Sequence, residues 1–439
     1  MSGKENTRSI AVDILLAVDR DGEMSHLALR KTLDQYRFLP RHDRAFIRRV
    51  SMGSIERMIE LDYIIDHFSK TKVKKMKPAI RAILRSAVYQ MKYMDAVPDS
   101  AACNEAVKLA VQRGFSGLRG FVNGVLRGVC AGIADLEYPS AEEEPVRAIS
   151  VRYSMPEWLV ERFCEAYGRE RCVHILEAFL NDDDSTCVRV DTNRESVDEV
   201  CRSLRSQGIS VVPDDRLSYA LHISGYDRLD KIPEFADGIL YVQDIASMMV
   251  AGTAQPKEGD FILDVCAAPG GKSLHLAQMM RGTGMVEARD LTEYKVGLIR
   301  ENISRCRAKN MRASVHDALD HDPEMEEKAD IVIADLPCSG LGVIGRKADI
   351  KYRTSEEKIR ELAALQRQIL DVVRHYVRPG GSLLYSTCTM TKEENQENTA
   401  WFLKHNAQFS LCSEKQYLPD EGCDGFYIAR FVRHAKTPE

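Results

Sequence analysis

The feature that most constrains the fold is a strand, a glycine-containing turn and a helix that follow one another near residue 265. The apolar run Phe261–Val265 is followed by Cys266–Lys272, and a helical pattern begins directly afterwards at Leu274. Glycines let backbone N–H groups approach a ligand, and the start of a helix offers the positive end of its dipole. The pattern therefore predicts a nucleotide-type binding loop at the carboxyl end of a strand.

Strands and helices alternate from residue 238 to the end of the chain. Helical patterns at 295–309 and 355–377 separate β-rich apolar runs, and such alternation is typical of a doubly wound parallel sheet. We expect an α/β Rossmann-like domain over 238–439, with strands at Phe261–Val265, Met285–Arg289, Ile331–Asp335, Ser382–Ser386 and Phe426–Phe431.

Residues 1–135 predict an all-α domain. Ile10, Ile14 and Leu15 form an apolar stripe at helical spacing, and residues 80–88 form another. Residues 136–150, rich in Glu, Pro, Ser and Ala, predict a linker. Residues 151–237 mix short helices and strands, with strands expected at Thr186–Val190 and Ile209–Val212, and predict a small α/β module.

Charge is distributed unevenly along the chain. The net charge is −5, yet residues 1–130 hold 23 Lys and Arg against 14 Asp and Glu. The basic residues gather in two groups, which suit contacts with phosphates: Lys70, Lys72, Lys74, Lys75 and Lys77, and Arg41, Arg44, Arg48 and Arg49. The asymmetry favours a nucleic-acid partner, and solvated helix faces are the alternative explanation.

Several classes of protein are disfavoured. No apolar run is long enough to span a bilayer, and the N-terminal stretch is polar and lacks a signal-peptide core. The 12 cysteines include no C-x-x-C pair, so neither a disulfide framework nor a structural zinc site is expected. We expect a cytoplasmic monomer with reduced thiols, no membrane contact and no bound metal.

The binding loop does not match the common phosphate-binding motifs. G-x-G-x-x-G is absent, and a Walker A loop would need glycine where Cys266 stands. A nucleoside that carries methionine and no phosphates fits better. Asp290, at the end of the next strand, is placed to bind ribose hydroxyls. Asp317 could reach the adenine ring, or it could be an ordinary turn carboxylate.

Two cysteines follow predicted strands in the same domain. Cys338 lies just after Asp335, and Cys388 follows Tyr385–Thr387. A strand-end cysteine is usually a small buried hydrophobe. However, a thiolate that adds to carbon 6 of cytosine makes carbon 5 able to attack a methyl sulfonium, and cysteine suits this role. Further on, the spacing of Thr391 and Glu394 predicts a helix capping box, which accounts for Glu394 without catalysis.

Five strings in family order resemble the RNA cytosine-5 methyltransferases of the Sun/RsmB group: YVQDIAS, DVCAAPGGK, IADLPCSGLGVI, YSTCT with the following EEN, and DGFYIARF. The basic front, from RSIAVDILLAV through RHDRAFIRRV to FVNGVLRGV, resembles the NusB-like RNA-binding domain. Together they cover nearly the whole chain and resemble the bacterial enzymes that methylate a cytosine of 16S ribosomal RNA. A class I methyltransferase domain and rRNA processing are implied.

The resemblance implies a role for each matching residue. Cys388 would be the nucleophile, Cys338 would assist release of the adduct, and Asp335 would contact both the methionine end and the target base. Asp290 would bind the ribose and Asp317 would lie near the adenine. The loop that holds S-adenosyl-L-methionine would comprise Cys266, Ala267, Ala268, Pro269, Gly270, Gly271 and Lys272.

This chain departs from the family pattern at two places. Leu336 stands where alanine is usual, and Gly345–Tyr352 lacks the second arginine, the His-Pro pair and the tryptophan. Two alternatives stay open: the same chemistry on transfer RNA or another RNA, and a non-catalytic RNA-binding assembly factor with a relic cofactor domain. The intact Asp290, Asp335, Cys338 and Cys388 argue against a relic.

Overall fold

The computed structural model of the protein describes residues 6–181 and 185–435. The first five residues of the polar N-terminal stretch lie outside this range. The chain divides into two compact units. The helical unit comprises Met1–Asn181 together with Ile344–Arg353, and the sheet unit comprises Asp182–Val343 and Thr354–Glu439. Helices α9 (Glu157–Tyr167) and α10 (Arg169–Phe179) lie within the predicted middle module, but they cluster with the helical unit.

The helical unit is built on buried apolar stripes, as the sequence predicts. In α5, Ile80, Ile83, Leu84 and Val88 are at most 1% exposed and belong to the main core of this unit. Its helices are α1 (Thr7–Asp19), α2 (Ser25–Gln35), α3 (Arg41–Glu56), α4 (Met58–Phe68), α5 (Pro78–Tyr93), α6 (Asp99–Gln112), α7 (Arg119–Gly132), α8 (Pro145–Tyr153), α9 (Glu157–Tyr167), α10 (Arg169–Phe179) and α16 (Ile350–Arg353).

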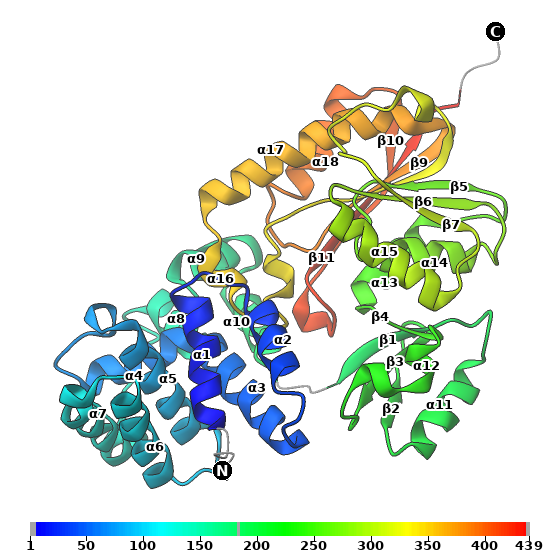
Figure 1. The fold of residues 1–439 in the computed structure, drawn as a ribbon. Helices are drawn as coiled ribbons and strands as arrows, with labels where there is room; N and C mark the ends of the chain where they lie inside the picture. Colours follow the sequence, from blue (N-terminus) through cyan, green and yellow to red (C-terminus); the bar gives the residue numbers. More distant parts are fainter. Residues whose placement is uncertain (1–5, 182–184, 436–439) are drawn as a thin grey trace. The chain divides into compact units, whose positions relative to one another are not determined.

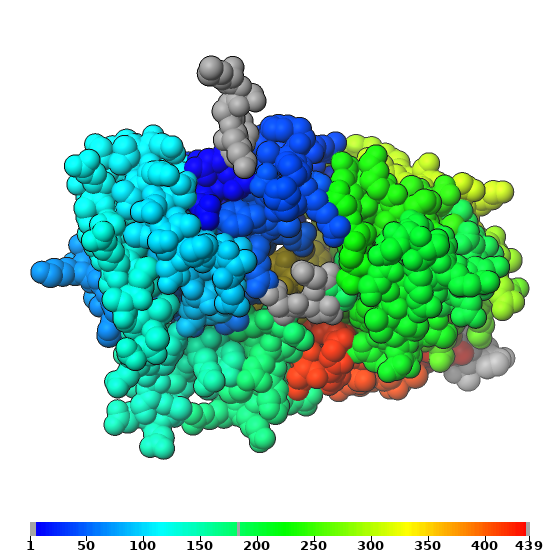
Figure 2. Space-filling view, turned by 90° about the horizontal axis from the view of Figure 1, so that it is seen from below, coloured from blue at the N-terminus to red at the C-terminus, as the bar shows by residue number. Residues whose placement is uncertain are grey.

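The lysines that precede α5 face solvent. All five lysines between residues 70 and 77 are exposed, whereas Val73 and Met76 between them are buried. The arginine group at residues 41–49 lies on α3. Figure 2 shows one face of this unit in blue to teal, formed by segments that are far apart in the sequence. Basic side chains are thus presented from a packed helical scaffold, an arrangement suited to a polyanionic partner.

A small antiparallel sheet opens the sheet unit. Its strands run in the order β2-β3-β1-β4. Helix α11 begins with a capping box in which Ser196 and Glu199 exchange hydrogen bonds. The elements are β1 (Thr186–Val190), α11 (Val197–Ser206), β2 (Ser210–Pro213), β3 (Ala220–Ser224), α12 (Pro233–Ala236) and β4 (Leu240–Val242).

The large sheet has seven strands in the order β10-β11-β9-β8-β5-β6-β7. The five strands from β9 to β7 are parallel, and β11 and β10 extend the sheet in antiparallel fashion. They are β5 (Phe261–Asp264), β6 (Met285–Asp290), β7 (Met311–Val315), β8 (Ala329–Asp335), β9 (Val377–Thr387), β10 (Phe409–Tyr417) and β11 (Phe426–Arg433). The alternation of strands and helices therefore correctly predicts a Rossmann-like fold.

Helices cover both faces of this sheet (Figure 1). One face packs with α13–α15 around Ile262, Ile331 and Ile333, and the other packs with α17 and α18 around Leu263 and Val332. Neighbouring side chains of a strand enter opposite cores because they alternate between the two faces. The helices are α13 (Ile245–Ala254), α14 (Gly271–Met279), α15 (Glu293–Cys306), α17 (Glu356–Val373) and α18 (Gln396–His405).

The order of the strands reverses between β5 and β8. The chain passes outward from β5 through β6 to β7 and then returns to β8 and β9 on the other side of β5. At such a switch point the loops after neighbouring strands leave in opposite directions and open a crevice at the carboxyl ends. The site is therefore expected beyond the ends of β9, β8, β5 and β6.

Candidate active site

The parallel strands bring the predicted site residues to one edge of the sheet. Asp335 ends β8 and lies in register with Ser386 of β9, two residues before Cys388. Asp264 ends β5, which lies beside β8, and Asp290 ends β6 on the other side of β5. The two thiols, the glycine loop and the strand-end carboxylates thus follow adjacent strands, although they are spread over more than 120 residues of sequence.

The loop between β5 and α14 depends on its two glycines. Gly270 has φ +102°, a conformation that residues with a side chain rarely adopt. Gly271 lies so close to the ring of Tyr241 that a Cβ there would come within 2.7 Å of it. The glycines therefore let the backbone turn tightly into the N-terminus of α14, where the first N–H groups and the helix dipole can bind a ligand.

Carboxylates hold this loop from both sides. The Asp290 Oδ2 accepts a hydrogen bond from Ala268 N at 2.9 Å, and its Oδ1 accepts from Lys295 Nζ at 2.9 Å. Asp264 accepts a hydrogen bond from Ser273 Oγ at the start of α14. Burial raises the pKa of Asp264 to about 7. The loop is thus fixed to the ends of β5 and β6 before any ligand binds.

Asp317 lies two residues beyond β7, the next strand outward. Its Oδ1 accepts a hydrogen bond from Leu319 N at 3.0 Å, and its side chain is half-buried. This is the geometry of an ordinary aspartate turn, and it leaves the second carboxylate oxygen available. The position beyond β7 is compatible with a carboxylate that reaches the adenine ring and with an ordinary turn carboxylate.

Lys272 and Asp335 form an ion pair between the glycine loop and the end of β8. Lys272 Nζ lies 2.7 Å from Asp335 Oδ2, and Ser386 Oγ donates to Asp335 Oδ1 at 2.7 Å. Although burial opposes the charge, the carboxylate of Asp335 holds the pKa of Lys272 above its ordinary value. The ammonium also lies over the ring of Phe426. The ion pair and the hydrogen bond from Ser386 thus link the glycine loop to the ends of β8 and β9.

The two predicted thiols lie in contact. Cys338 Sγ and Cys388 Sγ are 3.2 Å apart, within hydrogen-bonding distance for sulfur, and both side chains are half-buried. The hydrogen bond with Cys388 and then burial raise the pKa of the Cys338 thiol well above its ordinary value. Lys272 interacts electrostatically with Cys388. The raised pKa keeps the Cys338 thiol protonated at neutral pH, so it can donate the hydrogen bond to Cys388 Sγ.

Glu394 does not cap a helix, so the prediction of a capping box is wrong. Helix α18 begins two residues later, after Asn395. Glu394 is fully buried and accepts from Ser339 N at 2.8 Å, from Ser339 Oγ at 2.6 Å and from Thr391 Oγ1 at 2.6 Å. It therefore fixes the residue that follows Cys338.

Arg189 is a second residue that the sequence did not reveal. It lies on β1, is 1% exposed, and its Nη1 donates to Gly271 O at 3.1 Å while its Nη2 donates to Gln278 Oε1 at 2.9 Å. Burial lowers its pKa to about 10, so the guanidinium stays charged at neutral pH. Arg189 thereby attaches the small sheet to both ends of α14. In the sequence, the only sign of this role is an arginine within the otherwise largely apolar strand TCVRV.

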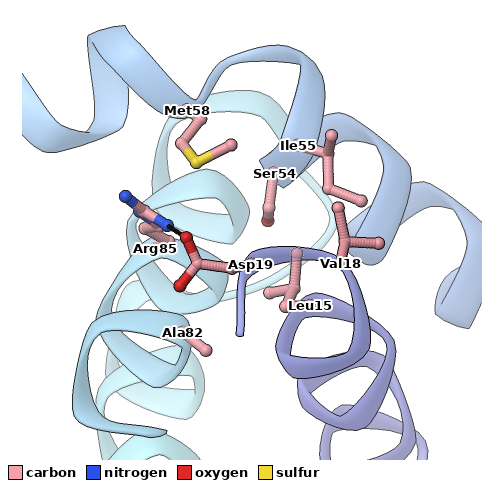
Figure 3. Close-up of a pocket in the computed structure, with 8 residues that line it drawn as sticks. All are labelled: Leu15, Val18, Asp19, Ser54, Ile55, Met58, Ala82 and Arg85. Carbon is pink, nitrogen blue, oxygen red and sulfur yellow. Dashed lines mark hydrogen bonds and ion pairs between the residues drawn. The ribbon is translucent and has the colours of Figure 1, made fainter. Parts of the chain in front are cut away.

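A cavity between α1, α3, α4 and α5 contains the ion pair of Asp19 and Arg85 and the hydroxyl of Ser54 (Figure 3). Its volume of about 10 Å³ would hold one water molecule at most.

Within the described ranges, no cluster of His, Cys, Asp and Glu is placed to hold a metal ion. No helix there is long and apolar enough to cross a membrane.

Three family models match consecutive parts of the chain. The model of the NusB family matches residues 5–131, and a ferredoxin-like domain of RsmF/B-like methyltransferases matches residues 155–227. The model of the 16S rRNA methyltransferase RsmB/F matches residues 251–432. The order of the three agrees with the succession of domains that the sequence predicts.

Similar proteins extend over the whole chain. The probable ribosomal RNA small subunit methyltransferase B of Bacillus subtilis (strain 168) is 34% identical, over 97% of this chain and 98% of the relative. The crystal structure of PH0851 is 26% identical and covers 98% of this chain and 100% of its own, with a TM-score of 0.81. A methyltransferase homologue from Pyrococcus horikoshii, 26% identical, covers 66% of this chain and 99% of its own, with a TM-score of 0.58. This chain therefore belongs to the RsmB/F family of 16S rRNA methyltransferases.

Proposed function

We propose that this rRNA methyltransferase transfers a methyl group from S-adenosyl-L-methionine to carbon 5 of a cytosine in 16S ribosomal RNA, with Cys388 as the nucleophile. The observation that carries the proposal is the contact between Cys338 Sγ and Cys388 Sγ, 3.2 Å apart, beside the ion pair of Lys272 and Asp335. The B. subtilis relative, named as a small subunit rRNA methyltransferase B, supports the choice of substrate.

The residues of the glycine loop fit S-adenosylmethionine better than a nucleoside triphosphate. Lys272, which would face phosphates in a Walker A loop, is already paired with Asp335. The surrounding acidic residues Asp264, Asp290 and Asp335 would repel phosphates, whereas they suit ribose hydroxyls and a cationic amino acid. We infer that Cys266–Lys272 and Asp290 hold the cofactor, with Asp317 near the adenine. When bound, the cofactor supplies an electrophilic methyl group.

The cytosine would be activated by the chain's own side chains. The Cys388 thiolate forms a bond from Sγ to carbon 6, which makes carbon 5 nucleophilic. The charge of Lys272 would favour that thiolate electrostatically, and Asp335, paired with Lys272, would contact the edge of the base that carries N3 and the amino group. Because these groups lie at the ends of adjacent strands, the base must leave its stack to reach them.

Release of the product would depend on a fall in the pKa of the Cys338 thiol. Its pKa is raised chiefly by the hydrogen bond with Cys388, and this cause disappears once Cys388 Sγ is bonded to carbon 6. The Cys338 thiol can then give its proton to solvent and accept the proton from carbon 5. The electrons of that C–H bond reform the double bond between carbons 5 and 6, and Cys388 leaves as a thiolate.

The proposal is tested by incubating the chain with methyl-labelled S-adenosylmethionine and protein-free 16S ribosomal RNA. We expect the label in 5-methylcytosine after the RNA is digested to nucleosides. Transfer RNA and 23S ribosomal RNA serve as controls. Label in transfer RNA alone would reject the 16S target, and label in another nucleoside would reject the chemistry at carbon 5. A chain that binds 16S RNA and never methylates it would instead be an assembly factor.

RNA binding should depend on the exposed lysines that precede α5. Changing the five lysines at 70–77 to glutamine should weaken binding of 16S RNA. The salt slope should fall by about 0.7 for each lysine that contacts a phosphate, because each such contact releases counterions. Binding is measured by fluorescence anisotropy at several salt concentrations.

A matched variant of the sheet unit controls for the loss of five positive charges. It changes five lysines that are exposed there: Lys257, Lys309, Lys328, Lys358 and Lys404. We expect a smaller change of the salt slope in this control variant. Equal slopes in the two variants would show that the lysines before α5 make no specific contribution to RNA binding.

A further inference from the structure

Ten residues of the sequence that follows β8 belong to the helical unit. Ile344–Arg353 clusters with residues before 182, whereas Val343 and Thr354 on either side belong to the sheet unit. We call Ile344–Arg353 the anchored segment. It contains the stretch in which this chain departs from the family pattern, and it begins six residues after Cys338.

Buried contacts fix the anchored segment to the helical unit. Asp349 is 2% exposed and accepts hydrogen bonds from both the backbone N–H and the hydroxyl of Ser25, which begins α2. Lys351 is 1% exposed and donates to Glu56 O of α3 at 2.8 Å. Ala348 is buried in the main core of the unit. Buried charged groups with specific partners define one arrangement, because leaving them unpaired is costly.

The loop before the anchored segment is fixed just as firmly to the thiol site. Gly342 N donates to Cys388 O at 3.0 Å, and Gly425 N donates to Gly342 O at 2.9 Å. A Cβ on Gly342 would lie 1.8 Å from Gly425 O, so the two backbones touch. Only Val343 separates this contact from the anchored segment. The anchored segment therefore continues almost directly into the loop that carries Cys338.

The chain that follows the anchored segment returns to the same loop. Helix α17 begins at Glu356, and its residue Gln366 donates to Pro337 O at 2.9 Å and to Glu394 Oε1 at 3.2 Å. Pro337 directly precedes Cys338. One end of the anchored segment is therefore joined through Val343 to the loop that follows Cys338, and the other end leads through α17 to a hydrogen bond with the residue before Cys338.

We propose that the helical unit is a positioning element for the reaction: by holding the anchored segment, it fixes the loop Pro337–Val343 and the thiol of Cys338. The helical unit is then part of the catalytic apparatus and more than a detachable RNA-binding domain. Asp349 and Ser25 are positioning residues that act through Cys338. The catalytic readout of this inference rests on the proposed function, whereas its thiol readout does not.

The test uses the full chain with Asp349→Ala, which removes the acceptor for Ser25. Alkylation by iodoacetamide is followed by mass spectrometry of the cysteine peptides, without RNA or cofactor. We expect the alkylation rate at Cys338 to rise at least about fivefold, because local opening of the loop becomes easier. Exposed Cys412 on β10 should react at an unchanged rate. With 16S RNA, kcat should fall about tenfold while KM stays within about twofold.

Two further variants make the outcome decisive. Lys347→Ala alters an exposed side chain of the same segment and should leave both readouts unchanged. If Asp349→Ala does not fold by circular dichroism, Ser25→Ala removes one hydrogen bond only and should shift both readouts in the same direction. An unaltered alkylation rate at Cys338 in the folded variants would overturn the inference. Absence of 5-methylcytosine with the native chain would overturn the proposed function, and the alkylation rates would still decide this inference.

Discussion

The Cys388→Ala chain is expected to produce no 5-methylcytosine, a loss of rate on the order of 10⁴-fold or more, as when other covalent catalysts lose their nucleophile. The alanine removes the sulfur that is assigned to the attack, which contacts Cys338 Sγ and interacts electrostatically with Lys272. Binding of S-adenosylmethionine should change less than about twofold, because Cys388 lies outside the glycine loop. Product is measured by nucleoside mass spectrometry, and cofactor binding by calorimetry.

The Cys338→Ala chain distinguishes attack from release. It keeps the nucleophile and loses the group proposed to accept the proton from carbon 5, so a covalent protein–RNA complex should accumulate on denaturing gels. Cys388→Ala should form none, and Cys412→Ala, an exposed cysteine of β10, should behave like the native chain. A complex with Cys388→Ala and none with Cys338→Ala would reverse the two roles.

Local pattern was sufficient to predict most of the sheet, and the structure brings the predicted site residues to one edge of it. The apolar run before Asp264, the glycines that follow it and the strand-end cysteines carry a signal within a few residues. Strand β10 was missed because it lies at the edge of the sheet, where six consecutive residues are exposed and the sequence FSLCSEKQY lacks apolar alternation. An edge strand with polar side chains on both faces cannot be recognised from hydrophobic periodicity.

The residues that support the site could not be predicted for a different reason. Glu394 has the spacing of a capping box, and only the tertiary structure shows that its carboxylate binds Ser339 instead. Arg189 is a single charged residue in its strand. Its hydrogen-bond partners, Gly271 and Gln278, lie more than 80 residues further along the sequence. The anchored segment contains polar residues that would suit an exposed loop, yet Asp349 and Lys351 are buried. Such contacts depend on long-range packing, which spacing does not encode.

Removing either member of the ion pair between Lys272 and Asp335 should impair both stability and catalysis. Asp335→Leu leaves a largely buried ammonium without its counterion, and Lys272→Met leaves a carboxylate without its own. Because the side chains are 16% and 26% exposed, we expect each to cost about 1–3 kcal/mol, below the range for a fully buried pair. Methylation should fall by about 100-fold or more in either variant, since the proposed mechanism places the pair beside the reacting base. Denaturant unfolding and initial rates measure the two effects.

The double variant Lys272→Met with Asp335→Leu separates these two effects. It removes both charges together, so no ion is left buried and unpaired, and its stability should return to within about 1 kcal/mol of the native chain. Its activity should nevertheless stay as low as that of the single variants, because it restores neither the positive charge proposed to favour a thiolate at Cys388 nor the carboxylate proposed to contact the base. Recovery of activity along with stability would show that the pair only holds the glycine loop against the end of β8. Persistent loss of activity in a stable chain would assign the pair a direct part in the reaction.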